Sequence, residues 1–358
     1  MTSATASAAT APAALDGLRL ADALRAGIYR LFGQTDHINK INVFPVPDGD
    51  TGTNLSMTLS AVLTALDRAP EPHTGALLVR IADAALDGAR GNSGAILAQF
   101  LLGLADKAGA QATLTATDFA NAATAGAAYA RDAVSQPREG TLLTVLRDFA
   151  DALQARTEAD PGASFKTALD ASLARARASL AATTDQLQEL HDAHVVDAGA
   201  LGFVELLEGI AHYLDTGEVG TATTSPAHRA AAESVADSAF VETVPRLRAE
   251  EPRYCTECLV AANAATDGAG SAGSAGSAAS TDLDLRRLRE GLSALGASLV
   301  VGGNKRKAKV HIHTDDPERV FEFAATFGEL TGQKADDMQR QQSAAHHART
   351  QRVAIVTD

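Results

Sequence analysis

Hydrophobic positions recur every three to four residues through the first 216 positions of the chain. In the earliest stripe, Leu24, Ile28 and Leu31 fall on one helical face, while Arg25 and Arg30 fall on others. Similar stripes predict further helices over residues 54–68, 75–88, 94–106, 116–133, 141–155, 164–180 and 200–214. About eight helices joined by short connections predict a mainly α fold, a helical bundle or barrel over residues 17–216.

The period of the pattern changes beyond residue 216. Residues 217–239 lack an apolar stripe, which is typical of a linker. Strand-like segments then alternate with amphipathic helical ones. In chain order these segments are residues 253–261 (strand), 282–296 (helix), 297–302 (strand), 309–314 (strand) and 316–327 (helix). This order predicts a smaller α+β domain over residues 240–330.

Four other segments interrupt or flank the two predicted domains. Residues 1–16 predict a disordered tail, and residues 331–352 predict a polar, His- and Gln-rich linker. Residues 262–280 form a Gly/Ala/Ser tract whose G-x-G-x-x-G match continues as a repeat, which favours a low-complexity insert over a dinucleotide site. The closing residues 353–358 (VAIVTD) predict the first strand of a further, truncated domain.

Composition narrows the class of protein. Hydrophobic residues make up 46% of the chain, but aromatic residues only 4%, so much of the apolar content is Ala and favours closely packed helices. The net charge of −13 argues against a nucleic-acid partner. No run approaches the roughly 18 apolar residues of a membrane span, and the two cysteines cannot form a disulfide framework. We therefore expect a cytoplasmic protein without a membrane span.

An acidic turn at residues 39–54 (NKINVFPVPDGDTGTN) carries the clearest chemistry. Pro45 and Pro47 restrict the backbone before Asp48, and Gly49 allows a bend that brings Asp48 and Asp50 together. Two crowded carboxylates repel each other unless a hard cation such as Mg²⁺ lies between them. The alternative is a helix N-terminus at which Asp50 or a neighbouring threonine serves as a cap.

Three further glycine-bearing turns precede predicted helices. They read GARGNSG at residues 88–94, EGT at residues 139–141 and VDAGA at residues 196–200. Backbone N–H groups at a helix start point toward an anion, and Asn92 and Ser93 add side-chain donors. Singly, each turn is equally well a cap or a tight connection. Gathered at one end of a bundle, the turns would surround a polyphosphate.

A pair of cysteines and a pair of histidines mark the predicted α+β domain. His311 and His313 lie two residues apart on a strand and share a face, whereas Cys255 and Cys258 point to opposite faces. This spacing disfavours a four-ligand Cys₂His₂ zinc site. It leaves a three-ligand site of Cys255, His311 and His313, with a half-exposed strand carrying two histidines as the alternative.

Together, the segments NVFPVPDGDTGTN, GARGNSGAILAQ, EGTLLTV and VVDAGALGF resemble the nucleotide-binding (DhaL-type) domain of dihydroxyacetone-kinase-like proteins. The resemblance is strongest to the catalytic subunit of bacterial fatty acid kinases. It covers residues 17–216 and, less strongly, residues 240–330. The closing VAIVTD resembles the first strand of a DegV-type fatty-acid-binding protein, the partner of such kinases.

The resemblance implies a helical barrel that holds ATP and Mg²⁺ at one end. It implies Asp48 and Asp50 as catalytic magnesium ligands. The relatives have a third aspartate where this chain has Val43, and either Asn42 or a water substitutes for it. The number of magnesium ions stays open. The implied nucleotide-side positions are Thr51, Gly52, Asn54, Gly91, Asn92, Ser93, Gly94, Thr141, Asp197, Gly199 and Ala200. In the middle domain, the resemblance implies Cys255, His311 and His313 as ligands of a second metal, Zn²⁺.

The implied activity is a kinase that transfers a phosphoryl group to a fatty acid carboxylate presented by a DegV-type carrier, separate or fused. A carboxylate acceptor is already ionised at neutral pH and needs no strong base. Two alternatives stay open: a dihydroxyacetone (glycerone) kinase-type activity, and a non-catalytic nucleotide-sensing scaffold. We also expect a homodimer formed through the middle domain.

Overall fold

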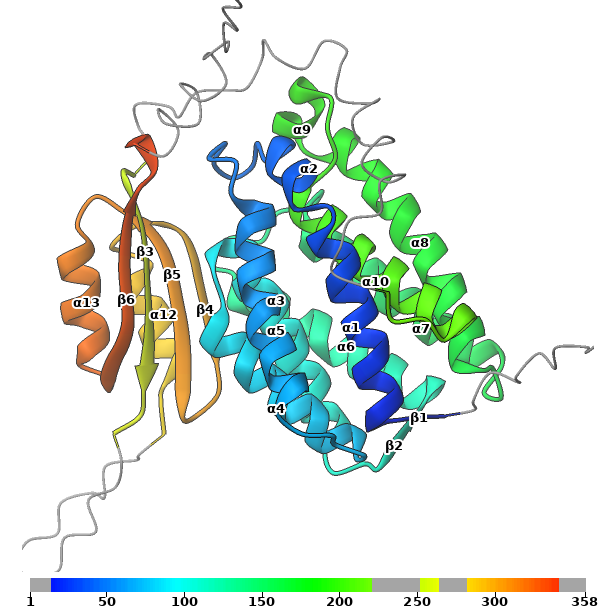
Figure 1. The fold of residues 1–358 in the computed structure, drawn as a ribbon. Coiled ribbons are helices and arrows are strands. Elements are labelled where there is room, and N and C mark those ends of the chain that lie inside the picture. The colour runs from blue at the N-terminus through cyan, green and yellow to red at the C-terminus, as the bar shows by residue number, and fades with distance from the viewer. Residues whose placement is uncertain (1–13, 221–251, 264–281, 341–358) are drawn as a thin grey trace, which may run out of the picture.

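The computed structural model describes residues 14–220, 252–263 and 282–340 (Figure 1). The predicted strand at 353–358 lies outside these residues, as do most of the predicted tail, the linker at 217–239 and the insert at 262–280. Residues 14–16, which were expected in the tail, form a short strand instead. This strand, β1 (Ala14–Asp16), pairs antiparallel with β2 (Thr113–Thr115).

Ten helices make up the described part of residues 14–220. They are α1 (Gly17–Phe32), α2 (Thr35–Lys40), α3 (Thr51–Arg68), α4 (Thr74–Gly88), α5 (Gly91–Ala108), α6 (Ala116–Ala133), α7 (Leu142–Ala159), α8 (Phe165–Gln186), α9 (Gln188–Ala193) and α10 (Ala198–Thr216). Apart from the short α2 and α9, each helix packs against the next, and α10 returns to α1. The eight long helices therefore close a ring, which confirms the predicted barrel.

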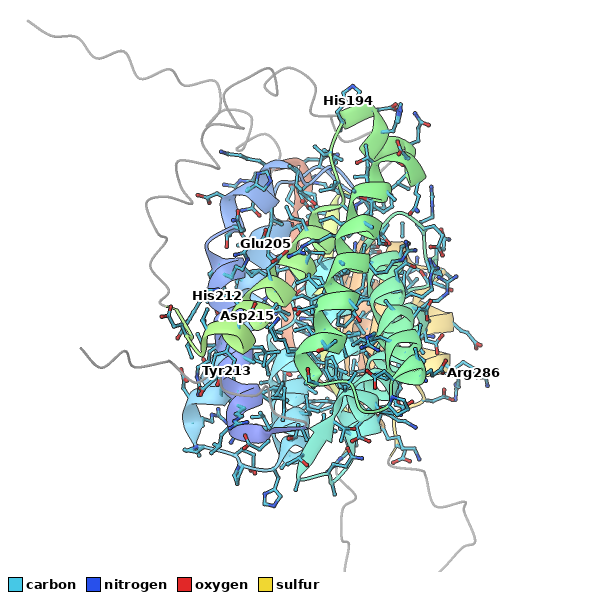
Figure 2. The ribbon with its side chains drawn as sticks, turned by 90° about the vertical axis from the view of Figure 1, so that its right-hand side faces the viewer. His194, Glu205, His212, Tyr213, Asp215 and Arg286 are labelled. Atoms are coloured by element: carbon cyan, nitrogen blue, oxygen red, sulfur yellow. The ribbon has the colours of Figure 1, made fainter. Side chains whose placement is uncertain are left out.

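An apolar core fills this barrel. Phe149 is fully buried and packs edge-on against Phe203, with ring centroids 5.5 Å apart, and Phe203 packs in the same way against Phe100. On the outside, Arg30 of α1 donates to Glu205 of α10 at 2.8 Å, which joins the first and last helices of the ring. Figure 2 shows Glu205 on that face, with His212 and Asp215 further along α10. None of the described helices combines the length and apolar character that crossing a membrane requires.

The second part of the chain is a four-stranded antiparallel sheet with two helices on one face. The strands β3 (Tyr254–Ala261), β4 (Ala297–Gly303), β5 (Lys307–Thr314) and β6 (Glu329–Asp337) have the order β4-β5-β3-β6. Helices α12 (Leu285–Leu292) and α13 (Pro317–Ala325) cover the face formed by Cys258, Val310 and Ile312. This arrangement confirms the predicted smaller domain.

Strand β6 corrects the prediction of a linker from residue 331. Residues 329–337 pair with β3 along its length, from Ala261 opposite Glu329 to Tyr254 opposite Asp337. The segment (ELTGQKADD) is mostly exposed and has almost no apolar alternation. Polar edge strands of this kind avoid unwanted pairing with other chains, and the same polarity removes the sequence signal that identifies buried strands.

The other face of the sheet lies against the helical barrel, beside α5 (Figure 1). Val300 of β4 packs with Ala95 and Ala133, and Ser135 donates its backbone N–H to Leu299 at 3.0 Å. At the end of the sheet, Lys307 lies 2.6 Å from both Asp83 and Asp87 of α4. The sheet domain is thus fixed against the helices that carry the second glycine-rich turn.

Candidate active site

The acidic turn is held together by Asn42, which is buried. Its amide nitrogen donates to Asp48 Oδ1 at 2.6 Å, and its amide oxygen accepts from Thr51 Oγ1 at 2.5 Å. Gly49 takes the left-handed conformation (φ 72°) that the predicted bend requires. In this structure Asn42 orients Asp48, and its proposed role as a magnesium ligand stays a prediction.

Asp50 occupies the N-cap position immediately before α3 but makes no side-chain capping hydrogen bond to that helix within the described residues. The Thr51 hydroxyl donates to Asn42, and the Thr53 hydroxyl accepts from Asn39 at 3.0 Å. These threonine side chains therefore bond to residues before α3 and not to its backbone. Burial, and then the charge of the neighbouring Asp50, raise the pKa of Asp48 well above its usual range. Two crowded carboxylates that are not used to cap a helix are available to bind a cation.

The start of α5 lies directly against the start of α3. Gly91 has φ +60°, which favours glycine, and a Cβ built there would lie 2.5 Å from Asn54 Nδ2, so a larger residue would be strained and would displace the Asn54 side chain. Beside it, the Oδ1 atom of Asn92 is buried and has no hydrogen-bond partner among the described residues. A buried polar atom without a partner is costly, and Asn92 lines the same pocket as the two carboxylates.

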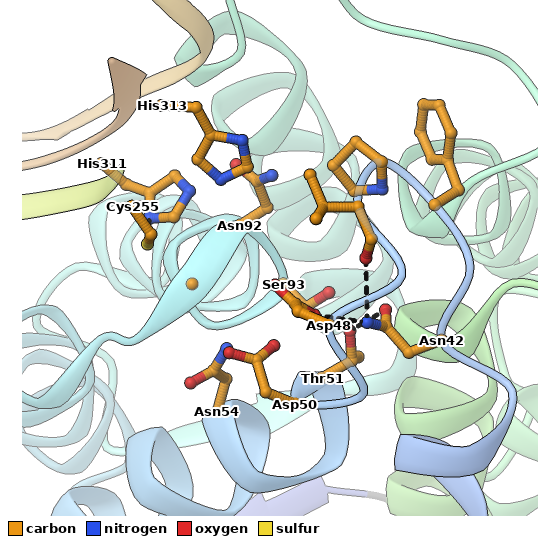
Figure 3. A pocket seen from close by; sticks show the side chains of 14 residues that line it. Asn42, Asp48, Asp50, Thr51, Asn54, Asn92, Ser93, Cys255, His311 and His313 are labelled. Carbon is orange, nitrogen blue, oxygen red and sulfur yellow. Dashed lines mark hydrogen bonds between the residues drawn. The ribbon is translucent and has the colours of Figure 1, made fainter. Parts of the chain in front are cut away.

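One pocket joins the two turns and, unexpectedly, the sheet domain (Figure 3). Its lining residues are Asn42, Phe44, Pro45, Val46, Asp48, Asp50, Thr51, Asn54, Gly91, Asn92, Ser93, Cys255, His311 and His313. The acidic turn forms one wall, the N-terminus of α5 another, and the Cys–His cluster the third. The residues of the two metal sites that the sequence predicts in separate domains therefore line one cavity.

The other predicted nucleotide-side residues lie behind this lining. Gly94 lies against α3, where an added Cβ would overlap Thr58 Oγ1, and a Cβ on Gly52 would overlap the Thr35 carbonyl oxygen. Thr141 caps α7 by accepting from Leu143 N at 3.4 Å.

The turn before α10 also reaches the α5 turn. A Cβ on Gly199 would lie 2.7 Å from Ser93 Oγ, and Asp197 accepts from Ala200 N at 2.8 Å and from the Leu142 amide. The four turns thus gather at one end of the barrel, as the polyphosphate hypothesis requires, although only two of them line the pocket.

Asp197 provides a test of the electrostatics at this end of the barrel. Burial raises its pKa from 3.8 to about 6. The stabilising contribution of the protonated form is complete below pH 3.8 and is lost as the pH rises through 6. Asp197→Asn keeps a capping side chain and carries no charge. We expect the variant to exceed the wild type by about 1–3 kcal/mol in free energy of unfolding at pH 8.

The measurement is denaturant unfolding of both proteins between pH 5 and pH 8. The stability difference should shrink steadily as the pH falls through 6. A constant difference across this range would show that burial does not penalise the Asp197 carboxylate.

The Cys–His cluster brings three potential metal ligands together. One ligand atom each from Cys255, His311 and His313 lies within 4.8 Å of the other two. The Nε2 atom of His311 is buried without a hydrogen-bond partner in the described part of the chain. Cys258 lies on the opposite face, in the core of the sheet domain, where burial raises the pKa of its thiol to about 12. The predicted separation of the two cysteines is therefore confirmed.

The two imidazoles of the cluster differ in charge. Burial lowers the pKa of His311, but the Cys255 sulfur and Glu257 raise it to about 10 overall, so this ring carries a proton that a metal ion would have to displace. Burial, and then the charge of His311, lower the pKa of His313 to about 3, so His313 is neutral, as a metal ligand must be. The donor set of one sulfur and two imidazoles suits Zn²⁺.

Sequence reasoning missed Glu257 and Lys309, which are both 3% exposed at the side chain and only 3.1 Å apart. They share the barrel-facing side of the sheet with the metal cluster. The alternation of side chains along a strand would have identified them. Cys255 and Glu257 lie two residues apart on β3, and Lys309, His311 and His313 are spaced by two on β5, so each set shares one face of the sheet. A polar stripe facing a packed domain indicates a buried, functional face.

Comparisons with known proteins agree with this architecture. Residues 45–212 match the DAK2 domain, and residues 251–345 match the middle domain of FakA-like fatty acid kinase proteins. Protein YloV of Bacillus subtilis (strain 168) is 30% identical over 335 residues, which cover 91% of this chain and 56% of that protein. Uncharacterized protein SSP1546 of Staphylococcus saprophyticus is 32% identical over 331 residues, with the same coverage. The chain thus spans about half the length of the curated relatives it matches.

Among solved structures, dihydroxyacetone kinase from C. freundii in its native form superposes with a TM-score of 0.42 and 18% sequence identity, covering 59% of this chain and 38% of that one. The same enzyme in complex with AMP-PNP and Mg²⁺ gives a TM-score of 0.43 at 18% identity, covering 59% and 37%.

Proposed function

We propose that this chain, which joins a DAK2 domain to a FakA-like fatty acid kinase middle domain, is a kinase that transfers a phosphoryl group from Mg²⁺–ATP to a fatty acid carboxylate. The observation that carries the proposal is the shared pocket, in which paired carboxylates face the N-terminus of α5. Phosphoryl transfer asks a protein mainly to position the reactants and to neutralise charge, and these are the groups that do so.

Asp48 and Asp50 would hold magnesium, which supplies charge neutralisation at the phosphate oxygens when it is bound. Their fit rests on the burial of Asp48 and on its crowding by Asp50, which together raise the pKa of Asp48. The backbone N–H groups of Asn92 and Ser93 at the start of α5 and the side-chain N–H of Asn92 would bind phosphate oxygens, with the helix dipole adding to the attraction. Asn42 keeps the Asp48 carboxylate directed into the pocket.

The acceptor determines which kinase this is. A carboxylate attacks the terminal phosphorus directly, the bond from that phosphorus to the bridging oxygen breaks, and ADP leaves; the product is an acyl phosphate. No proton has to be removed from such an acceptor. A dihydroxyacetone hydroxyl, by contrast, needs a general base. Because the carboxyl groups that line the pocket are those assigned to magnesium, and its two imidazoles are those that we assign to zinc below, the pocket favours the carboxylate acceptor.

The partner follows from the acceptor. A long acyl chain needs an apolar carrier, and we propose that a DegV-type fatty-acid-binding protein or domain presents the carboxylate at this pocket.

The test is ATP consumption by the purified chain, followed with oleate in the presence and absence of a DegV-type protein, and separately with dihydroxyacetone. We expect turnover only with the carrier and the fatty acid together. Turnover with dihydroxyacetone alone would move the assignment to a glycerone-type kinase, and nucleotide binding without any turnover would indicate a sensing scaffold.

We also propose that Cys255, His311 and His313 hold Zn²⁺, because the buried Nε2 of His311 has no partner among the described residues and the donor set fits. When bound, zinc would add a Lewis acid beside the phosphate-binding end of the pocket. We expect about one zinc ion per chain by elemental analysis of purified protein and a clear loss in Cys255→Ser. Equal zinc content in Cys258→Ser and wild type is the matched control, because Cys258 faces the core.

A further inference from the structure

Glu257 of β3 makes a contact that crosses from the sheet domain to the barrel. One carboxylate oxygen, Oε1, accepts the backbone N–H of Gly91 at 2.7 Å. Gly91 is the first residue of α5, the helix whose N-terminus lines the pocket. The first N–H groups of a helix have no partner inside the helix, and here one of them is bound by a residue 166 positions away in the sequence.

The same carboxylate reaches the Cys–His cluster. Oε1 also lies 3.1 Å from Nδ1 of His311, whose other nitrogen has no partner among the described residues. A histidine that binds metal through one nitrogen commonly donates from the other to a carboxylate, which fixes the ring orientation. A single oxygen atom therefore contacts both the candidate zinc ligand and the start of the candidate phosphate-binding helix.

The surroundings of Glu257 leave it little freedom. Its second oxygen, Oε2, accepts from Lys309 Nζ at 3.1 Å and lies 3.5 Å from the Arg90 guanidinium. On its other side Gly91 lies against the Asn54 side chain of α3, where a built Cβ would lie 2.5 Å from Nδ2. A change in the His311 ring would therefore reach Glu257 and, through Glu257, the backbone of Gly91.

We propose that Glu257 is a positioning residue that couples the Cys255–His311–His313 site to the nucleotide site, so that zinc bound at the first tightens the binding of nucleotide phosphates at the second. The inference rests on the function proposed above. Zinc fixes His311, His311 fixes Glu257, and the amide of Gly91 is then ordered before the nucleotide arrives. Nucleotide binding then costs less conformational entropy at the start of α5, so zinc binding and nucleotide binding favour each other.

Docking of the two domains does not by itself require this arrangement. Lys307 forms ion pairs with Asp83 and Asp87 at the same interface, and Val300 packs into an apolar contact with Ala95. A residue needed only for docking would have no reason to bond the first amide of the phosphate-binding helix. The matched control is therefore Lys307→Met, which removes docking ion pairs without touching Glu257.

The experiment measures the affinity of the full chain for AMP-PNP with Mg²⁺ by calorimetry, for protein loaded with zinc and for protein stripped of it. Wild type, Glu257→Gln and Lys307→Met are compared. We expect zinc to tighten nucleotide binding about fivefold or more in wild type and in Lys307→Met, and to have almost no effect in Glu257→Gln. By linkage, the nucleotide must tighten zinc binding by the same factor, which a competing chelator measures.

A wild-type factor near one, or an undiminished factor in Glu257→Gln, would overturn the coupling while leaving the kinase assignment intact. If the wild-type chain binds no nucleotide at all, both proposals fail. Should Glu257→Gln not fold, the double variant Glu257→Gln with Lys309→Met removes both buried charges and is subjected to the same comparison. A residue with a merely structural role would lower both affinities without changing the coupling factor.

Discussion

Asp50→Asn is expected to lower ATP-dependent turnover by about 10²–10³-fold while the chain keeps its fold. The change removes one negative charge from the pair that faces the N-terminus of α5, so magnesium and the phosphates are held less tightly. Asp48→Asn should act in the same way, because its oxygen stays hydrogen-bonded to Asn42 while its charge is lost. Turnover is measured with the acceptor and carrier that support it in wild type.

Stability should move in the opposite direction. The raised pKa of Asp48 means that its ionised form costs free energy in the folded protein at neutral pH. Both variants should therefore melt at or above the wild-type temperature in magnesium-free buffer. The control is Asp36→Asn, a carboxylate on the preceding short helix and outside the pocket lining, which should change neither quantity. Wild-type turnover in either pocket variant would remove the magnesium assignment.

The barrel was predictable because each of its helices carries its own signal. The predicted and observed bounds of α6 coincide at 116–133, since Thr115 caps the helix by accepting from the backbone N–H of Asp118, whose side chain in turn accepts from the Thr115 amide. Short elements without a stripe, such as α2 and α9, left no periodic pattern to read. Strand β6 was missed for a related reason, because its stability comes from pairing with β3 rather than from its own side chains.

The chemistry of the site was predictable residue by residue, but its assembly was not. Asp48, Asp50, Asn92 and Ser93 were chosen from local motifs, and the structure brings all four into one pocket. Nothing local to residues 255–313 indicates that the Cys–His face turns toward the barrel. That contact depends on close fits between distant segments, such as Gly302 against the side chain of Gln99, where an added Cβ would overlap the Gln99 amide.

The buried ion pair of Glu257 and Lys309, on the barrel-facing side of the sheet, should contribute strongly to the stability of the fold. Lys309→Met leaves the carboxylate of Glu257 buried with its nearest ammonium removed. Breaking a buried ion pair by deleting one partner typically costs about 3–5 kcal/mol. We expect a loss of this size in the free energy of unfolding, measured by urea denaturation. Lys307→Met, whose aspartate partners are largely exposed, should cost about 1 kcal/mol or less.

The double variant Glu257→Gln with Lys309→Met separates the charge from the packing. If the cost of Lys309→Met comes from a stranded carboxylate, neutralising that carboxylate should recover most of the lost stability, since neutral replacements of buried ion pairs are often tolerated. A double variant as unstable as Lys309→Met alone would instead place the cost in lost side-chain packing. A third result is a double variant that recovers stability without recovering the zinc–nucleotide coupling. That result would mean that the fold does not need the charges of this pair, and that their role is to link the two ligand sites.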